Sequence, residues 1–149
     1  MAMQLLMAKG AVDFNEALVK SAEGGHTAAM QLLIDNGADD FEGALGWASK
    51  DGHLAAIELC ITHGASDVNY VLCEAAAGNH IAAMQLVIDK GATAFNKALG
   101  FAAFNGSIAA MELCIACGAT NFNGARDEAY GGGQISAIEL LDARLKTGF

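Results

Sequence analysis

The chain has 149 residues, 54% of them hydrophobic, with 8 basic and 17 acidic residues and a formal net charge of −9. No basic stripe is present to neutralise phosphate groups, so nucleic acid and anionic membranes are not expected as partners. The four cysteines do not form a spaced disulfide framework, which favours a reduced, intracellular and cytoplasmic compartment.

No segment has the features of a membrane span or a leader. The longest apolar run, residues 113–117, is far shorter than the run of about 20 residues that crosses a bilayer. Met1–Lys9 is apolar, but it is short, lacks a basic start and fits the repeat described next. We therefore expect it to be part of the fold and not a signal peptide.

A repeat of 27 residues runs through the whole chain. Ala-Ala-Met recurs at this spacing at residues 28–30, 82–84 and 109–111, and similar triplets occupy the same place in the other repeats. Such periodicity is typical of solenoids, in which each repeat buries its apolar face against its neighbours. We predict a single domain over residues 1–149, made of repeats 1–27, 28–54, 55–81, 82–108 and 109–135 and a C-terminal half repeat, 136–149.

Two helices are predicted in each repeat, because two positions carry helix-ending residues. With positions counted from Met1, position 10 is glycine in all five full repeats, and position 25 is glycine or, once, Asn79. Both residue types tolerate the left-handed backbone that ends many helices. Position 13 is Asp or Asn in all full repeats but one and suits an N-cap, and Asp13 and Glu16 have the spacing of a capping box.

A first helix is therefore expected over about positions 14–24, and a second from about position 27 to position 9 of the next repeat. In chain order the expected helices are residues 1–9, 14–24, 27–36, 41–51, 54–63, 68–78, 81–90, 95–105, 108–117, 122–132 and 135 onward.

The two helices differ in their apolar pattern. In the first, positions 14, 18, 21 and 22 are apolar in most repeats and form one stripe about 100° wide. The second is apolar nearly all round, with leucine at position 5 throughout, so we expect it to be buried on most sides. The predicted fold is an all-α solenoid of stacked antiparallel helix pairs.

The segment Ala44–Leu54, followed by Leu59 and by Gly64 and Ala65, resembles the "ALxxAAxxGHL…LL…GA" half of the ankyrin repeat. Each repeat has 27 residues against the usual 33, and the missing six lie where ankyrin repeats have a β-finger and a Thr-Pro-Leu-His start. The resemblance implies a shortened, finger-less ankyrin variant, similar to repeats of large DNA viruses. It does not extend to binding through the finger.

Two motifs suggest metal or redox chemistry, but each has a structural reading that we favour. His26, His53 and His80 share position 26. Equivalent residues of adjacent repeats are about 8–10 Å apart, whereas zinc ligands lie ~2 Å from one ion, so we expect these histidines to satisfy backbone groups at the start of the second helix. Cys114 and Cys117 form a C-x-x-C motif at the end of a helix, and we expect Cys114 in the core and Cys117 exposed.

Two further motifs also favour structural roles. Gly131-Gly132-Gly133 precedes a helix but lacks the lysine of a phosphate-binding loop, and we interpret it as a loosened helix end. Asp39 and Asp40 form a carboxylate pair, with Asp40 expected as an N-cap. No catalytic residue, cofactor or metal site is predicted, and the chain is not expected to be an enzyme.

Large aromatic residues lie on a face of the first helix that should be wet. Positions 16, 20 and 23 lie opposite the apolar stripe, and exposed aromatics are typical of binding hot spots. For position 20, packing between repeats is an equal alternative. We predict a non-catalytic scaffold that binds another protein through a concave face formed by the first helices. The expected partner-binding residues are an aromatic centre, Trp47, Tyr70, Phe101 and Phe104, and a polar rim, Lys20, Lys50, Glu74 and Lys97.

Two alternatives stay open. The first is a self-assembling structural protein: Met3, Leu6 and Met7 sit at positions that inner repeats bury, which predicts a weak homodimer through the N-terminal face. The C-terminal half repeat, in contrast, carries Asp142 on an isoleucine site, as a polar cap would. The second alternative is a targeting module of a larger enzyme complex.

The fifth repeat departs most from the pattern. Arg126 replaces the leucine of position 18, Tyr130 replaces an alanine, and three glycines follow. Because glycine weakens a helix, we expect residues 121–134 to open before the other repeats.

Overall fold

The computed structural model describes residues 13–147, and all regular secondary structure in this range is helical. The chain divides between Ser66 and Asp67 into two compact parts. The helices of the N-terminal part are α2 (Phe14–Glu23), α3 (Thr27–Asp35), α4 (Phe41–Lys50) and α5 (Leu54–Thr62). Those of the C-terminal part are α6 (Val68–Ala77), α7 (Ile81–Asp89), α8 (Phe95–Asn105), α9 (Ile108–Ala116), α10 (Phe122–Gly131) and α11 (Ile135–Thr147).

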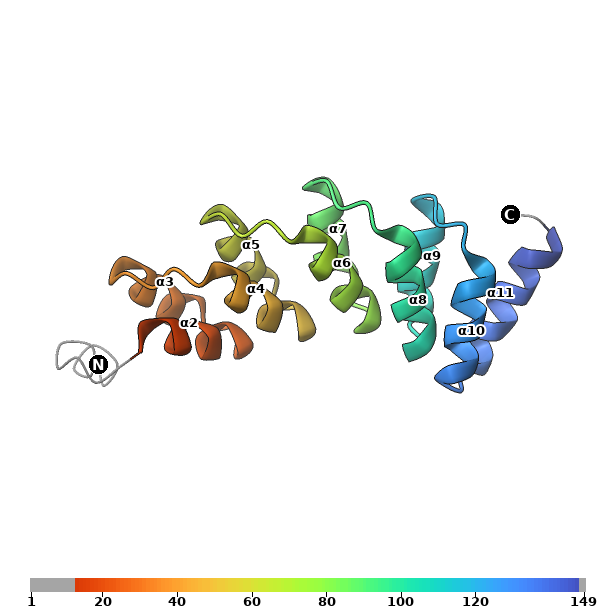
Figure 1. Cartoon of the computed structure of the whole chain (residues 1–149), viewed down its shortest axis with the longest axis horizontal. Helices are drawn as coiled ribbons and strands as arrows, with labels where there is room; N and C mark the ends of the chain where they lie inside the picture. The colour runs from red at the N-terminus through yellow and green to blue at the C-terminus, as the bar shows by residue number, and fades with distance from the viewer. Residues whose placement is uncertain (1–12, 148–149) are drawn as a thin grey trace. The chain divides into compact units, whose positions relative to one another are not determined.

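Each repeat forms a first and a second helix that pack together as a pair, such as α6 with α7 and α8 with α9 (Figure 1). The predicted bounds of these helices agree with the structure to within one residue, so the prediction of an all-α fold of repeated helix pairs is confirmed for the described residues. None of the described helices has both the length and the apolar character needed to cross a bilayer. The predicted helix at residues 1–9, with Met3, Leu6 and Met7, lies outside the described residues.

The helices begin and end where the predicted caps stand. The Asp13 carboxylate accepts hydrogen bonds from the N–H groups of Asn15 and Glu16, at 3.0 and 3.1 Å. Asp40, Asp67 and Asn121 each cap their helix in a similar way. The residues at position 25, including Asn79 with φ 60°, adopt the left-handed conformation, which confirms the predicted helix ends.

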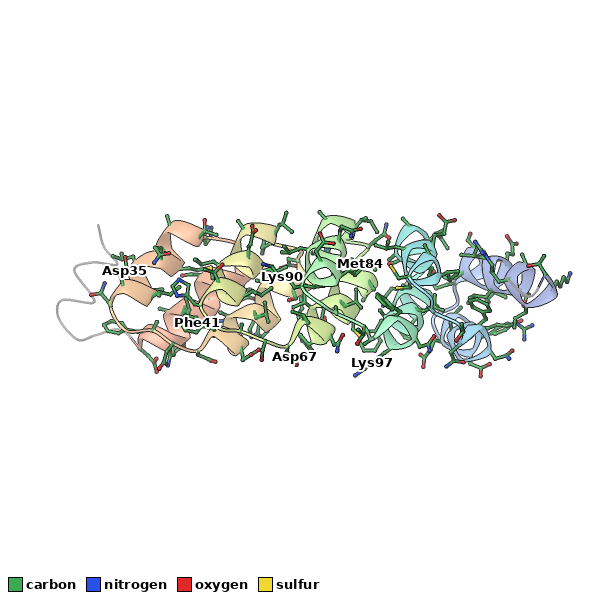
Figure 2. The ribbon with its side chains drawn as sticks, turned by 90° about the horizontal axis from the view of Figure 1, so that it is seen from above. Asp35, Phe41, Asp67, Met84, Lys90 and Lys97 are labelled. Carbon is green, nitrogen blue, oxygen red and sulfur yellow. The ribbon has the colours of Figure 1, made fainter. Side chains whose placement is uncertain are left out.

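The core lies between the first helices and their second-helix partners. Leu18 and Leu45 in the N-terminal part and Leu72 and Leu99 in the C-terminal part are almost completely buried, which confirms the apolar stripe of the first helix. Within each part, neighbouring first helices pack closely, whereas neighbouring second helices touch only sparsely. Seen from above, the Lys97 side chain extends outward from α8 (Figure 2).

The expectation that the second helices are buried on most sides is wrong. Leu54, Ile81 and Ile135, all at position 27, are 40%, 37% and 70% exposed. The position-5 leucines, such as Leu86, are only half-buried. Because neighbouring second helices touch only sparsely within each part, they cover little of one another's surface. Hydropathy indicates how much of a helix could be buried, but not what is there to cover it.

Position 15 provides a bridge between consecutive repeats that the sequence analysis missed. The Asn69 Oδ1 atom accepts hydrogen bonds from the N–H groups of Thr93 and Ala94, at 2.8 and 3.0 Å. Asn96 does the same for Thr120 and Asn121 at the same two distances. These N–H groups belong to the short loop that leads into the next first helix, so the side chain of one repeat supplies the acceptors that this loop lacks.

We predict that Asn69→Ala destabilises the C-terminal part by about 1–3 kcal/mol, because two N–H groups lose their acceptor at a net value of roughly 0.5–1.5 kcal/mol each. The start of α8 is sensitive because its N-cap, Ala94, has no side-chain acceptor. Asn69→Asp keeps the accepting oxygen and should change stability by less than about 0.5 kcal/mol. Chemical denaturation of both variants tests this: equal losses would show that the bridge contributes nothing specific.

Position 26 does not cap its own helix, contrary to the expectation. His26, His53 and His80 stand at N-caps but make no side-chain capping bond. The His53 Nε2 atom instead donates to the carbonyl of Glu23, at the end of the first helix of the preceding repeat, at 3.0 Å. The ring lies over Gly25, where an added Cβ atom would be 2.6 Å from His53 Nδ1. The histidine satisfies the end of a neighbouring helix, and glycine makes room for its ring.

In the C-terminal part, different residues make the equivalent contact between consecutive repeats. There position 25 is Asn79, and position 26 of the next repeat is the smaller Ser107. The Ser107 hydroxyl donates to the carbonyl of Ala77 at 2.7 Å, and Asn79 Oδ1 accepts from the N–H of Ala110 at 3.0 Å. The start of α9 is therefore capped by a side chain of the preceding repeat.

Candidate functional site

All eight predicted partner-binding residues lie on first helices. The four aromatics are 37–47% exposed, so their side chains reach solvent despite their size. Lys20, Trp47 and Lys50 belong to the N-terminal part. The C-terminal part carries the other five: Tyr70, Glu74, Lys97, Phe101 and Phe104.

In the N-terminal part, Trp47 and Lys50 form one surface element on α4. The Lys50 Nζ atom lies 4.3 Å from the centroid of the Trp47 ring, a cation–π arrangement. Lys20, on α2, forms an exposed ion pair with Glu23 at 3.7 Å. The predicted aromatic centre and polar rim thus meet at Trp47 and Lys50.

On α6, Tyr70 and Glu74 are one helical turn apart. Partial burial raises the pKa of the Tyr70 phenol, and the nearby carboxylates of Glu74 and Asp67 raise it further. An ordinary tyrosine, with a pKa of about 10, is already protonated at neutral pH, so the Tyr70 hydroxyl is a hydrogen-bond donor there.

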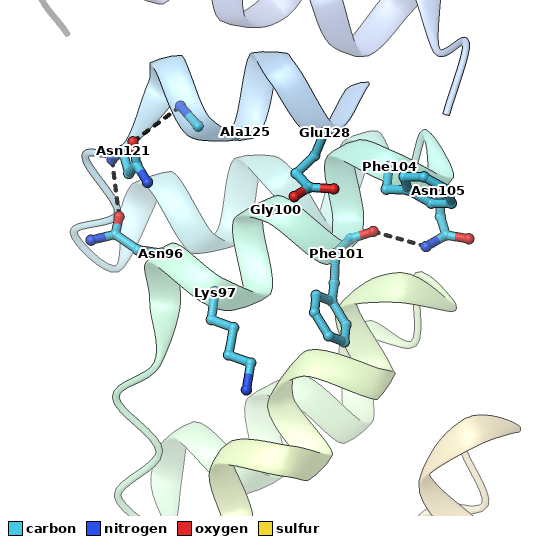
Figure 3. A pocket seen from close by; sticks show the side chains of 10 residues that line it. Asn96, Lys97, Gly100, Phe101, Phe104, Asn105, Asn121, Ala125 and Glu128 are labelled. Atoms are coloured by element: carbon cyan, nitrogen blue, oxygen red, sulfur yellow. Dashed lines mark hydrogen bonds between the residues drawn. The ribbon is translucent and has the colours of Figure 1, made fainter. Parts of the chain in front are cut away.

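The C-terminal part contains a groove between α8 and α10, with a volume of about 450 Å³. Three predicted residues, Lys97, Phe101 and Phe104, line it. In the close-up, Lys97 and Phe101 extend from α8 away from α10, while Glu128 projects from α10 toward Gly100 (Figure 3). All four residues line the groove, but the Lys97 and Phe101 side chains lie on the side of α8 away from α10, whereas the Glu128 carboxylate lies on the side that faces α10.

Two glycines line the groove, and a neighbouring side chain lies beside each of them, Glu128 at Gly100 and Asn121 at Gly124. Gly100 on α8 and Gly124 on α10 present no side chain, and Ala125 next to Gly124 presents only a methyl group. A Cβ atom on Gly100 would meet only the Glu128 side chain, at 3.6 Å. Glycine inside a helix costs about 1 kcal/mol relative to alanine. These glycines were visible in the sequence, but which helix faces them depends on how the repeats stack.

Three asparagines line the groove, and their hydrogen bonds fix the orientation of each amide. Asn96 Oδ1 accepts from two backbone N–H groups, and Asn121 Oδ1 accepts from Gly124 N–H at 3.1 Å. Asn105 Nδ2 donates to the carbonyl of Phe101 at 2.9 Å (Figure 3). The first two amides therefore keep NH₂ groups for a ligand, and Asn105 keeps its oxygen.

The three consecutive glycines form a close contact and not a loosened helix end, which corrects the sequence interpretation. Gly132 lies against the end of α8, where a Cβ atom would overlap the carbonyl oxygen of Phe104. A Cβ atom on Gly131 would be in ordinary contact with the Phe104 ring, at 3.7 Å. Gly133 supplies the left-handed turn, with φ 67°. The glycines let α10 approach α8 at the edge of the groove.

The two polar departures of the last repeats are explained by one ion pair. Arg126 Nε on α10 pairs with the carboxylate of Asp142 on α11, and the guanidinium lies 5.3 Å from the Tyr130 ring centroid. Asp142, expected as part of a polar cap, thus makes an ion pair with Arg126, and its side chain remains 38% exposed. Tyr130, at an alanine site, is 55% exposed and was missed as a surface aromatic.

The cysteines are all free thiols, and three of them are buried. Cys114 is in the core as predicted, and Cys117 is half-buried instead of exposed. Burial, reinforced by Glu42, raises the pKa of Cys60 to about 11. Burial, reinforced by Cys117 and Cys73, raises the pKa of Cys114 to about 12. Among the described residues, no three His, Cys, Asp or Glu side chains cluster as metal ligands would.

We predict that a thiol reagent at about pH 8 modifies Cys117 first and reaches Cys60 and Cys114 only when the fold opens. The reacting species is the thiolate. Because the pKa of the Cys114 thiol is about 12, only roughly one Cys114 side chain in ten thousand is ionised at pH 8. Mass spectrometry of peptides taken during labelling measures the order. Native-state labelling of Cys114 as fast as that of Cys117 would contradict this prediction.

No protein-family model matches the chain, and no curated protein is significantly similar to it.

Proposed function

We propose that this protein is a non-catalytic scaffold, an ankyrin-type repeat protein without the β-finger, which binds another protein through the face formed by its first helices. The observation that carries the proposal is the groove between α8 and α10, with the half-exposed rings of Phe101 and Phe104 along it. Exposed aromatics beside a concave surface are the residues that most often dominate protein interfaces.

The chemistry of the groove supports binding over catalysis. Its titratable side chains are one amine, Lys97, and one carboxylate, Glu128, and its lining includes no histidine, cysteine or serine. The site therefore offers no nucleophile paired with a base. Its other polar groups are amides, which orient a ligand by hydrogen bonds.

Within each part, the first helices also lie closer together than the second helices. A stack built in this way curves toward its first helices, so exposed residues on that side surround a bound segment more fully than those on the outer side.

The test is a paired capture experiment with the full chain as bait and a lysate of the native cell. Wild type is compared with the double variant Phe101→Ala/Phe104→Ala and with Ile81→Ala, which removes an exposed apolar side chain from a second helix. Quantitative mass spectrometry should show a partner that is retained by wild type and Ile81→Ala but lost from the double variant. Equal recovery on all three baits would rule out the first-helix face as the binding surface.

A chain that captures only its own copies would favour the self-assembly alternative. Light scattering measures the mass of the purified chain in solution. An oligomer would favour self-assembly, whereas a monomer would remove that alternative.

A further inference from the structure

The Glu128 carboxylate lies in the groove without a partner among the described residues. It projects from α10 over Gly100 of α8, where a Cβ atom on the glycine would be 3.6 Å from Glu128 Cγ (Figure 3). No hydrogen bond or ion pair joins this carboxylate to another described residue. Two basic residues of the same helices are turned elsewhere: Lys97 extends away from α10, and Arg126 pairs with Asp142 on α11. The carboxylate is therefore available to a cation of a ligand.

The exposed ring of Phe104 lies about one helical turn from this carboxylate. Gly100 and Phe104 are four residues apart on α8, which makes them neighbours on one face of that helix. Glu128 and Gly131 are neighbours on α10 in the same way, three residues apart. The Phe104 ring would be 3.7 Å from a Cβ atom on Gly131, and nearly half of its surface, 47%, is exposed. A carboxylate and an aromatic ring thus lie next to each other along the groove.

This combination suits the side chain of arginine. A guanidinium group is planar, pairs with a carboxylate through two N–H groups and stacks on an aromatic face, whereas the lysine ammonium group is a compact and strongly hydrated charge. The net charge of −9 attracts basic segments to the chain as a whole. About 450 Å³ of the groove stays open with the Glu128 and Phe104 side chains in place, which is ample for one long side chain.

We infer that the groove binds an arginine side chain of the partner protein, whose guanidinium group pairs with Glu128 and stacks on the Phe104 ring. This inference rests on the proposed function and names the chemistry of its ligand. Gly100 is part of the site, because a larger side chain at this position would displace the Glu128 carboxylate and fill the space beside it.

The first experiment selects ligands for the groove. Random peptides displayed on phage are selected on the full wild-type chain and counter-selected on Gly100→Leu, in which the groove is filled. Leucine is a better helix former than glycine, so the melting temperature of this variant should be unchanged or higher. Peptides that need the groove should share an arginine at one aligned position. Groove-dependent peptides without a shared arginine, or a selection that yields none, would overturn the inference.

The second experiment replaces the arginine of one selected peptide. Fluorescence anisotropy compares the arginine peptide with versions that carry lysine or citrulline, which keeps the shape of arginine but not its charge. Titrations at about 0.15 M salt limit long-range attraction. Citrulline should weaken binding about fivefold and lysine about two- to threefold, as expected for a partly exposed ion pair. Equal affinity of all three peptides would contradict the inference.

Two carboxylate variants then locate the arginine on the protein. Glu128→Gln should weaken binding of the arginine peptide about fivefold and leave the citrulline peptide within about twofold of wild type. Glu74→Gln is the matched control, because Glu74 has the same position in its repeat on α6 but does not line the groove. It should change neither affinity by more than about twofold. Equal losses in both variants would show that overall negative charge, and not the groove, attracts the peptide.

The two proposals fail separately. Peptides that ignore Glu128→Gln, combined with partner capture that still depends on Phe101 and Phe104, would reject the arginine site but keep the scaffold. Partner capture that is insensitive to both aromatics would reject the proposed function itself.

Discussion

Gly132→Ala is expected to destabilise the C-terminal part by about 3 kcal/mol, the upper range for forcing extra atoms into a close-packed contact. The added methyl group would overlap the carbonyl oxygen of Phe104, and backbone cannot move aside as the tip of a side chain can. Either α10 shifts away from α8, or the end of one helix unwinds. Chemical denaturation followed by circular dichroism measures the loss.

Gly131→Ala is the matched control, one residue earlier in the same helix. Its methyl group would be in ordinary contact with the Phe104 ring at 3.7 Å, and alanine is a better helix former than glycine. This variant should therefore be stabilised by roughly 0.5–1 kcal/mol. Similar effects of both changes would show that the three glycines serve only as a flexible helix end.

Leu99→Ala should cost about 2–5 kcal/mol, because it leaves a cavity at a fully buried position of α8, which packs against α6, α9 and α10. Phe101→Ala, two residues later, removes a larger but 37% exposed side chain. We expect the second change to lower stability by less than about 1 kcal/mol, so that its effect falls on binding.

Denaturation of both variants in parallel decides whether position 20 serves packing or recognition. A loss in Phe101→Ala as large as that in Leu99→Ala would assign Phe101 to the core and remove it from the binding surface.

The features that the sequence predicted well depend on neighbouring residues in the chain. Asp13 and Asp40 cap their helices, and the residues at position 25 end them, through backbone preferences that act within a few residues. Leu72 and Leu99 were recognised as core because a helix brings every third or fourth residue to one face. These rules require no knowledge of how the repeats stack.

The features that were missed or misread connect residues of different repeats. Asn69 bonds to a loop 24 residues away, and His53 to a carbonyl 30 residues away. The Arg126–Asp142 ion pair and the groove at Gly100 likewise depend on which helix faces which. A repeat pattern shows which positions are equivalent, but the distance and tilt between consecutive repeats decide which of them touch.

The partner-binding residues remain predictions, as do the N-terminal homodimer and the early opening of residues 121–134. The structure adds to the aromatic prediction a specific surface in the C-terminal part, where Phe101 and Phe104 share a groove with Lys97. It also provides a control on a second helix, because Ile81 of α7 is 37% exposed, as Phe101 is.

Hydroxyl-radical footprinting of the full chain, alone and saturated with the captured partner, tests the central claim most directly. Each side chain is compared with itself, so differences in intrinsic reactivity between residue types cancel. Binding through the first-helix face predicts that oxidation of Phe101 and Phe104 falls severalfold in the complex, while oxidation of Ile81 and Ile135 is unchanged. Protection of Ile81 and Ile135 with unchanged oxidation of both phenylalanines would contradict the account and place the partner on the second helices.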